Sequence, residues 1–130
     1  RRGVTWINES KANNVGAAVA AIEGLSGTLV LIAGGDGKGA DFAPLGPALT
    51  GRARAAVLLG RDREALAALL DGICPTVLVD DMDEAVAAAA GLARAEDTVL
   101  LSPACASLDM FASYAARGEA FAQAVGRLDE

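Results

Sequence analysis

Short apolar runs alternate with alanine-rich segments along almost the whole chain, and this alternation is the feature that most constrains the fold. The run Thr28–Ala33 (TLVLIA) is continuously apolar after its first residue, which is typical of a strand covered on both faces. Strands separated by helices pair in parallel, because each helix returns the chain to the same end of the sheet. The sequence therefore predicts a single α/β domain over residues 1–130. We expect it to be Rossmann-like, with a mainly parallel sheet of five to six strands and helices on both faces.

The bounds of these elements follow from the apolar periodicity and from the positions of Gly and Pro. The predicted strands are Val4–Asn8, Thr28–Ala33, Ala55–Leu59, Thr76–Val79 and Thr98–Leu101. The predicted helices are Asn14–Leu25, Phe42–Leu49, Arg61–Leu70, Met82–Ala93, Leu108–Ala115 and Glu119–Leu128. We interpret the dipeptide Arg117-Gly118 as the break between the last two helices.

The acidic charge balance and the absence of histidine exclude several classes of function. The chain carries 17 Asp and Glu against 11 Lys and Arg, so its net charge is −6. A nucleic-acid or anionic membrane surface would need a basic patch, and we expect neither partner. Without histidine, the usual zinc sites, Ser-His-Asp triads and Cys-His dyads cannot form within the chain, and we expect no metal site. Every apolar run is also shorter than the roughly 18 residues that a membrane-spanning helix needs.

The start of the chain indicates a domain of a longer protein, and its two cysteines indicate a reducing compartment. The start Arg1-Arg2-Gly3 has neither a Met nor the apolar region of a signal peptide, so we expect a domain cut from a longer protein. Cys74 precedes one predicted strand and Cys105 follows another, so we expect the thiols at opposite ends of the sheet, too far apart for a disulfide. Two lone thiols are typical of a reducing cytoplasm. We therefore expect a cytoplasmic protein, and a monomer.

Polar and glycine-rich segments follow three of the predicted strands, at the point where each strand ends. These segments are Asn8–Lys11, Gly34–Asp41 and Ser102–Asp109. Because the carboxyl ends of parallel strands meet at one edge of a sheet, and ligands bind beyond that edge, we expect the three segments to form a site for a small ligand.

The glycine-rich segment after the second strand imitates known nucleotide-binding loops without matching them. Residues 35–40 fit the pattern G-x-G-x-x-A, and Asp62 follows the next strand, as in a dinucleotide-binding fingerprint. Charged Asp36 and Lys38 occupy a loop that should offer bare backbone to pyrophosphate, and Pro44 delays the following helix. The loop also lacks the Ser or Thr and the first glycine of a phosphate-binding P-loop.

Two interpretations of this loop remain from the residues alone. In one, it is a surface turn with a solvated lysine. In the other, the backbone N–H groups of the glycines and the Lys38 ammonium converge on a carboxylate or a phosphate. The same pair of alternatives holds for Ser107, which is either an ordinary helix N-cap or part of an anion site at a helix start.

The acidic cluster at the start of the fourth predicted helix resembles a metal site only in composition. Its members are Asp80, Asp81, Asp83 and Glu84. Acidic residues at a helix start usually complement the helix dipole, and this is the interpretation that we favour. Cys105 is expected in the core rather than as a nucleophile, because the chain offers no base to activate it.

Beyond these patterns, several segments resemble the C-terminal domain of the Mur ligases that join D-glutamate to UDP-N-acetylmuramoyl-L-alanine. The matching segments are Trp6–Asn14, Gly34–Phe42, Leu101–Phe111 and Arg117–Phe121, in the order of that family and across nearly the whole chain. Sister Mur ligases usually carry an Asp-x-x-His motif after the first strand, where this chain has Glu9-Ser10-Lys11. The absence of histidine therefore also fits the D-glutamate branch.

The resemblance implies a role in making the peptidoglycan precursor. In that family ATP phosphorylates the alanyl carboxylate, and the amine of D-glutamate attacks the acyl phosphate. The N-terminal domain holds the UDP-sugar and the central domain holds ATP and Mg²⁺. The third domain contributes to the D-glutamate site. The resemblance therefore implies neither a catalytic residue nor a bound cofactor in this domain alone.

The resemblance also implies roles for seven residues of this chain. Lys38, Ser107, Leu108 and Tyr114 are expected to contact the D-glutamate carboxylates, and Asn13 stands in the same pocket where threonine is common. Lys11 and Glu9 are expected to face the nucleotide, Glu9 replacing the usual aspartate. Tyr114 replaces the commoner phenylalanine. The alternative is a self-sufficient module that binds a dinucleotide or a small anion.

Overall fold

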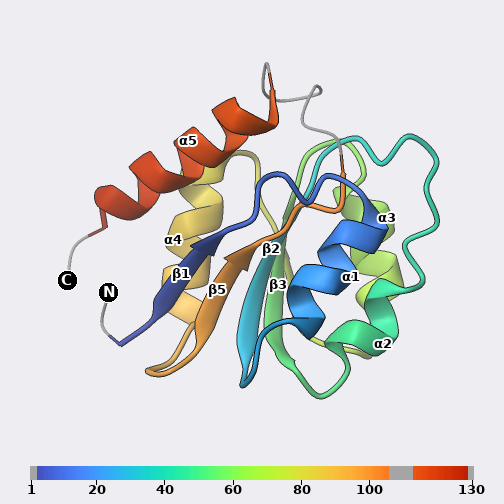
Figure 1. The fold of residues 1–130 in the computed structure, drawn as a ribbon, viewed down its shortest axis with the longest axis horizontal. Coiled ribbons are helices and arrows are strands. Elements are labelled where there is room, and N and C mark those ends of the chain that lie inside the picture. Colours follow the sequence, from blue (N-terminus) through green and yellow to red (C-terminus); the bar gives the residue numbers. More distant parts are fainter. Residues whose placement is uncertain (1–2, 106–112, 129–130) are drawn as a thin grey trace.

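The described part of the chain, residues 3–105 and 113–128 of the computed structural model, contains a five-stranded parallel sheet (Figure 1). The strands are β1 (Thr5–Asn8), β2 (Leu29–Gly34), β3 (Ala53–Leu59), β4 (Thr76–Leu78) and β5 (Thr98–Leu101). They lie in the order β1-β5-β2-β3-β4, and every neighbouring pair is parallel. All residues of β2 are buried, as its continuous apolar run predicts. The predicted fold class is therefore confirmed.

Helices cover both faces of this sheet. The helices are α1 (Val15–Glu23), α2 (Leu45–Leu49), α3 (Arg63–Leu70), α4 (Met82–Leu92) and α5 (Tyr114–Gly126). Helices α1, α2 and α3 lie on one face, and α4 and α5 lie on the other (Figure 1). Within the described residues, none of the helices is long and apolar enough to span a membrane.

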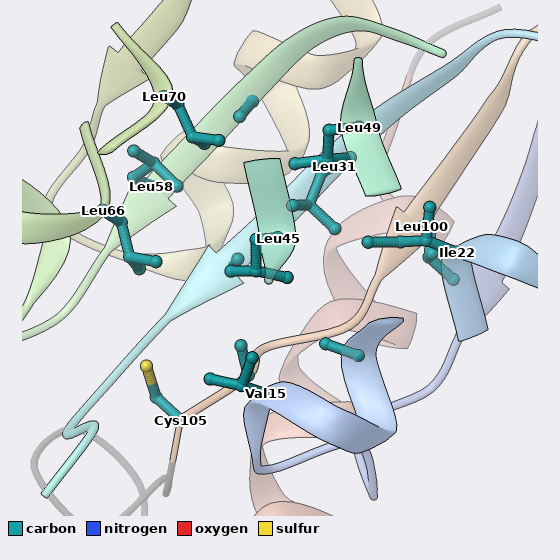
Figure 2. Packing of buried hydrophobic residues seen from close by; sticks show 14 of the residues in the cluster. Val15, Ile22, Leu31, Leu45, Leu49, Leu58, Leu66, Leu70, Leu100 and Cys105 are labelled. Carbon is teal, nitrogen blue, oxygen red and sulfur yellow. The ribbon is translucent and has the colours of Figure 1, made fainter. Parts of the chain in front are cut away.

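Each face of the sheet has its own hydrophobic core, because neighbouring residues of a strand point to opposite faces. Leu31 of β2 packs with Val15, Leu45 and Leu66 from the three helices on its side, and Figure 2 shows this packing. The next residue, Ile32, packs with the α4 and α5 side chains instead. Residues of β2 and β5 belong to both cores, and the polar segments follow the carboxyl ends of these strands. The two cores therefore hold in place the strands from which these segments begin.

Acidic residues at the start of α4 cap that helix. The carboxylate of Asp81 accepts a hydrogen bond from Glu84 N at 2.8 Å, and Glu84 Oε1 accepts one from Asp80 N at 3.0 Å. The first bond is that of an N-cap aspartate, whereas the second joins Glu84, in the first turn of the helix, to Asp80, the residue before the N-cap. The interpretation of this cluster as a helix start is confirmed. In the described ranges, no three His, Cys, Asp or Glu residues lie close enough together to hold a metal ion.

One prediction about the C-terminal helices is wrong. Helix α5 runs without interruption from Tyr114 to Gly126, so Arg117-Gly118 lies inside a helix and does not separate two. The reason is a close approach to β1, because a Cβ atom on Gly118 would clash with the Ser10 hydroxyl and lie 3.0 Å from Asn8 Nδ2. The start of the predicted helix Leu108–Ala115 lies outside the described residues.

Helix α2 begins later than the predicted Phe42, at Leu45. Asp41 Oδ1 accepts a hydrogen bond from Ala43 N at 2.9 Å, which forms an Asx turn, and Pro44 occupies the N-cap position. The glycine-rich loop is therefore longer than the sequence indicated.

The two cysteines lie at opposite ends of the parallel strands, as predicted. Cys74 lies just before β4, at the amino end, and Cys105 lies just after β5, at the carboxyl end.

Candidate functional site at the carboxyl edge of the sheet

The loops that follow β1, β2 and β5 leave the same edge of the sheet, because these strands are parallel neighbours (Figure 1). Backbone hydrogen bonds join the loops to each other. Ala104 N, after β5, donates to Ala12 O in the loop after β1 at 2.9 Å, and Gly34 N, at the end of β2, donates to Pro103 O at 2.9 Å. The described parts of the three segments expected to form a site, which include residues 102–105 of the third, thus lie together at this edge.

A buried arginine fixes the start of α5 against two of these loops. Arg117 is only 2% exposed. Its Nη1 donates to Cys105 O at 2.9 Å, and its Nη2 donates to Ser10 O at 3.0 Å. Asn8 Nδ2 adds a hydrogen bond to Gly118 O at 3.1 Å. The sequence interpretation missed this role, although an arginine inside an alanine-rich helix was a signal that could have prompted it.

The loop after β1 carries three of the predicted site residues. Glu9, Lys11 and Asn13 are all exposed there. Glu9 and Lys11 border a hollow of about 560 Å³ that has apolar walls, including Ile7 and Leu100. The same two side chains border a second hollow of about 370 Å³. The rim of both hollows thus carries two side chains of opposite charge.

The loop after β2 holds Lys38 in an exposed and strained position. Lys38 has φ +53°, a left-handed conformation that residues other than glycine rarely adopt. Ala104, in the loop after β5, has φ +64°. Glu96, with φ +74°, lies before β5 at the opposite end of the sheet, so this conformation is not confined to the candidate site. Within the described residues no carboxylate pairs with the Lys38 ammonium, which leaves this cation available to an anionic ligand.

Asp62, which the dinucleotide fingerprint would assign to a ribose, has a different partner in this structure. Its Oδ2 accepts a hydrogen bond from Gly37 N at 2.6 Å. Helix α2 has only five residues and begins at Leu45, so no helix start follows the glycines directly. A pyrophosphate would therefore find neither the free carboxylate nor the adjoining helix N-terminus that such a site uses. The geometry disfavours a dinucleotide site here.

The start of α5 places Tyr114. Ser113 is the N-cap, and its Oγ accepts a hydrogen bond from Ala116 N at 3.1 Å. Tyr114 is the first residue of the helix and is 41% exposed. Ser107 and Leu108 lie outside the described residues, so their predicted contacts stay predictions.

The comparison with known families decides which group of proteins this arrangement belongs to. The Mur ligase, glutamate ligase domain family matches residues 1–105. The chain belongs to this family. The match covers four-fifths of the chain and includes the loops that carry Glu9, Lys11, Asn13 and Lys38.

Curated members of this ligase group are similar along nearly the whole chain. A UDP-N-acetylmuramoylalanine–D-glutamate ligase of Methylococcus capsulatus is 56% identical over 126 residues, which are 97% of this chain and 28% of the relative. The ligase of the same name from Pseudomonas putida is 58% identical over 132 residues, covering 98% of this chain and 29% of the relative. The chain thus spans less than a third of the length of these relatives.

A solved structure shares the fold at much lower identity. It is a domain described as part of a UDP-N-acetylmuramate:L-alanyl-gamma-D-glutamyl-diaminopimelate ligase from Haemophilus ducreyi, with a TM-score of 0.59 and 15% identity. The match covers 95% of this chain and 93% of that domain. At this identity the likeness concerns the fold alone.

Proposed function

We propose that this Mur ligase domain supplies the D-glutamate-binding side of an ATP-dependent ligase that joins D-glutamate to UDP-N-acetylmuramoyl-L-alanine. The observation that carries the proposal is the exposed Lys38 ammonium on a strained, hydrogen-bonded loop. Relatives with the name of that ligase are 56% and 58% identical to this chain. The reaction forms a peptidoglycan precursor, and we place it in the cytoplasm, with the protein as a monomer.

D-Glutamate is a dicarboxylate, and its binding needs fixed positive charge and N–H donors. Lys38 offers an ammonium that pairs with one carboxylate. The start of α5 at Tyr114 offers backbone N–H groups at the positive end of a helix dipole. Ser107 and Leu108 are proposed to add contacts to the same carboxylates, and Asn13 completes the pocket from the loop after β1.

Glu9 and Lys11 are proposed to face the nucleotide, because they border the two hollows beside β1. ATP and Mg²⁺ activate the alanyl carboxylate as an acyl phosphate, and both are bound mainly outside this chain. The amine of D-glutamate then forms the amide bond and phosphate leaves. This domain contributes orientation, which is the largest demand when an amine attacks a bound acyl phosphate.

The test is the substrate dependence of a Lys38→Ala variant in the full-length ligase. Steady-state kinetics with D-glutamate and ATP varied in turn should show a loss confined to D-glutamate. A uniform loss for both substrates, or no loss, would contradict the proposed role of Lys38. Binding of D-glutamate, NAD and ATP by ligand-observed NMR separates the proposal from a dinucleotide-binding module.

A further inference from the structure

The carboxylate of Asp62 reaches out of its own loop and holds the loop that carries Lys38. Asp62 follows β3, and its Oδ2 accepts a hydrogen bond from Gly37 N at 2.6 Å. Its backbone N–H donates in the opposite direction, to Gly35 O at 3.0 Å. Two hydrogen bonds thus join Asp62 to Gly37, directly before Lys38, and to Gly35 at the start of the loop.

The side chain of Asp62 makes these contacts and does not cap its own helix. Asp62 is the N-cap residue of α3, where an Asp usually accepts a hydrogen bond from the first turn of the helix. It makes no such side-chain bond here. Its carboxylate is therefore available to the neighbouring loop, where it accepts the hydrogen bond from Gly37 N.

The glycine loop has little freedom at the point where Asp62 holds it. A Cβ atom on Gly37 would lie 2.5 Å from Phe42 Cζ and 3.2 Å from Asp62 Oδ2. The next residue, Lys38, has φ +53°, and its N–H donates to Asp36 Oδ1 at 2.9 Å. Arg61 contacts the same aspartate at 3.4 Å, but both side chains are partly exposed, so this pair contributes little.

We propose that Asp62 is a positioning residue for D-glutamate binding, because its carboxylate fixes the Gly37-Lys38 backbone and thereby places the Lys38 ammonium. This inference rests on the proposed function of Lys38. A cation on a loop that is already ordered loses less conformational entropy when the ligand binds. The negative charge of Asp62 itself repels an anionic ligand, so its benefit comes from its capacity to accept a hydrogen bond.

This distinction between hydrogen bonding and charge sets the expected results for single variants of the full-length ligase. Asp62→Ala should raise the KM for D-glutamate on the order of 10-fold and leave the KM for ATP within about 2-fold of wild type. Asp62→Asn keeps an acceptor oxygen and removes the charge, so its KM for D-glutamate should stay within about 3-fold of wild type. Asp71→Ala, at the other end of α3, is the matched control and should change neither constant.

The double variant Lys38→Ala/Asp62→Ala tests whether Asp62 acts by positioning Lys38 or by stabilising the fold in general. If Asp62 acts through Lys38, adding Asp62→Ala to Lys38→Ala should raise the KM for D-glutamate by less than about 2-fold further. Asp62→Ser can cap α3 with its shorter side chain, and it should reproduce the loss of Asp62→Ala in a stably folded protein. Thermal melts of each variant accompany the kinetics.

Several outcomes would overturn the inference. A wild-type KM for D-glutamate in Asp62→Ser, multiplicative effects in the double variant, or equal changes for ATP and D-glutamate would each show that Asp62 does not act through Lys38. An unchanged KM for D-glutamate in Lys38→Ala would instead remove the proposed function on which the inference rests.

Discussion

Arg54 and Asp97 form a two-pronged ion pair at the amino edge of the sheet, opposite the candidate site. Arg54 Nε lies 2.6 Å from Asp97 Oδ2, and Arg54 Nη2 lies 3.2 Å from Asp97 Oδ1. Arg54 belongs to β3 and Asp97 precedes β5, so the pair spans the amino end of β2, which lies between these strands. Asp97 is 4% exposed and also accepts a hydrogen bond from Arg94 N.

We predict that Asp97→Asn lowers the stability of the folded protein at neutral pH. The variant should also lose less stability than wild type as the pH falls. The hydrogen bonds from Arg54 hold the pKa of Asp97 below its ordinary value. A carboxyl group whose pKa is lowered by folding stabilises the protein above its unfolded pKa of about 3.9, and this stabilisation is lost as the pH falls through the folded pKa. The melting temperature at pH 7 should fall by roughly 5–10 °C.

The check is a set of thermal melts of wild type and Asp97→Asn between pH 7 and pH 2.5. The difference between the two proteins should be largest at neutral pH and should shrink in acid. Asp83→Asn is the control, since Asp83 pairs with Arg127 on the exposed surface. A constant difference across this range would mean that the charge of Asp97 does not matter.

Lys38→Ala should reduce kcat/KM for D-glutamate by about 10- to 150-fold, because a charge-assisted hydrogen bond contributes roughly 1.5–3 kcal/mol. The free energy of unfolding should change by less than about 0.5 kcal/mol, since Lys38 is exposed. Lys38→Arg should recover only part of the loss, because the planar guanidinium cannot occupy the same point. Kinetics with each substrate varied in turn, beside a thermal melt, measure these effects.

Gly118→Ala and Gly91→Ala should change stability in opposite directions, although both positions are helical. A Cβ atom at 118 would clash with the Ser10 hydroxyl and lie 3.1 Å from Ser10 Cβ, whereas a Cβ atom at 91 meets nothing within 4 Å. Alanine at 91 should therefore stabilise α4 by about 0.5–1 kcal/mol. Alanine at 118 should destabilise the domain by about 1–3 kcal/mol, because α5 must move away from β1.

Urea unfolding of the two glycine variants beside wild type provides the measurement. Equal stabilisation by both alanines would show that the contact between α5 and β1 tolerates a side chain. Because Gly118 lies next to Arg117, the Gly118 variant should also weaken D-glutamate binding in the full-length ligase, whereas the Gly91 variant should not.

Cys74 and Cys105 should remain reduced in the purified domain. They lie at opposite ends of the parallel strands, Cys74 at the amino end and Cys105 at the carboxyl end. Burial raises the pKa of the Cys74 thiol, which lowers its thiolate fraction at neutral pH and slows its reaction with disulfide reagents. Titration without reductant should find both thiols after unfolding. The absence of reactive thiols in that titration would contradict the observed strand order.

The strands could be predicted from the sequence because they depend on local apolar runs, and their parallel pairing followed from the helices between them; the order of the strands in the sheet was not predicted. The role of Gly118 could not be predicted, because the atoms that exclude a side chain there belong to Asn8 and Ser10, about 110 positions earlier. Read locally, a glycine after an arginine indicates a helix break. In the folded protein it permits a close contact between a helix and a strand.

The candidate site was also predicted only in part. The carboxyl edge of the sheet and the segments that carry Glu9, Lys11 and Lys38 follow from where the strands end, whereas Asn13 was named by family resemblance alone. The buried links made by Arg117 and Asp62 depend on which loops become neighbours. Sequence spacing does not contain that information, and family resemblance supplies contacts to ligands rather than the supports behind them.

The strand order also has a consequence for how this chain is made. Within the described residues, β1 pairs with β5 alone, and β5 is the last strand to be synthesised. A growing chain therefore exposes its first strand until Leu101 has emerged, while β2, β3 and β4 can already associate. The loop that bears Glu9 and Lys11 takes its final position only after that closing step. A ribosome that stalls before β5 therefore leaves a fragment in which β1 has no partner strand.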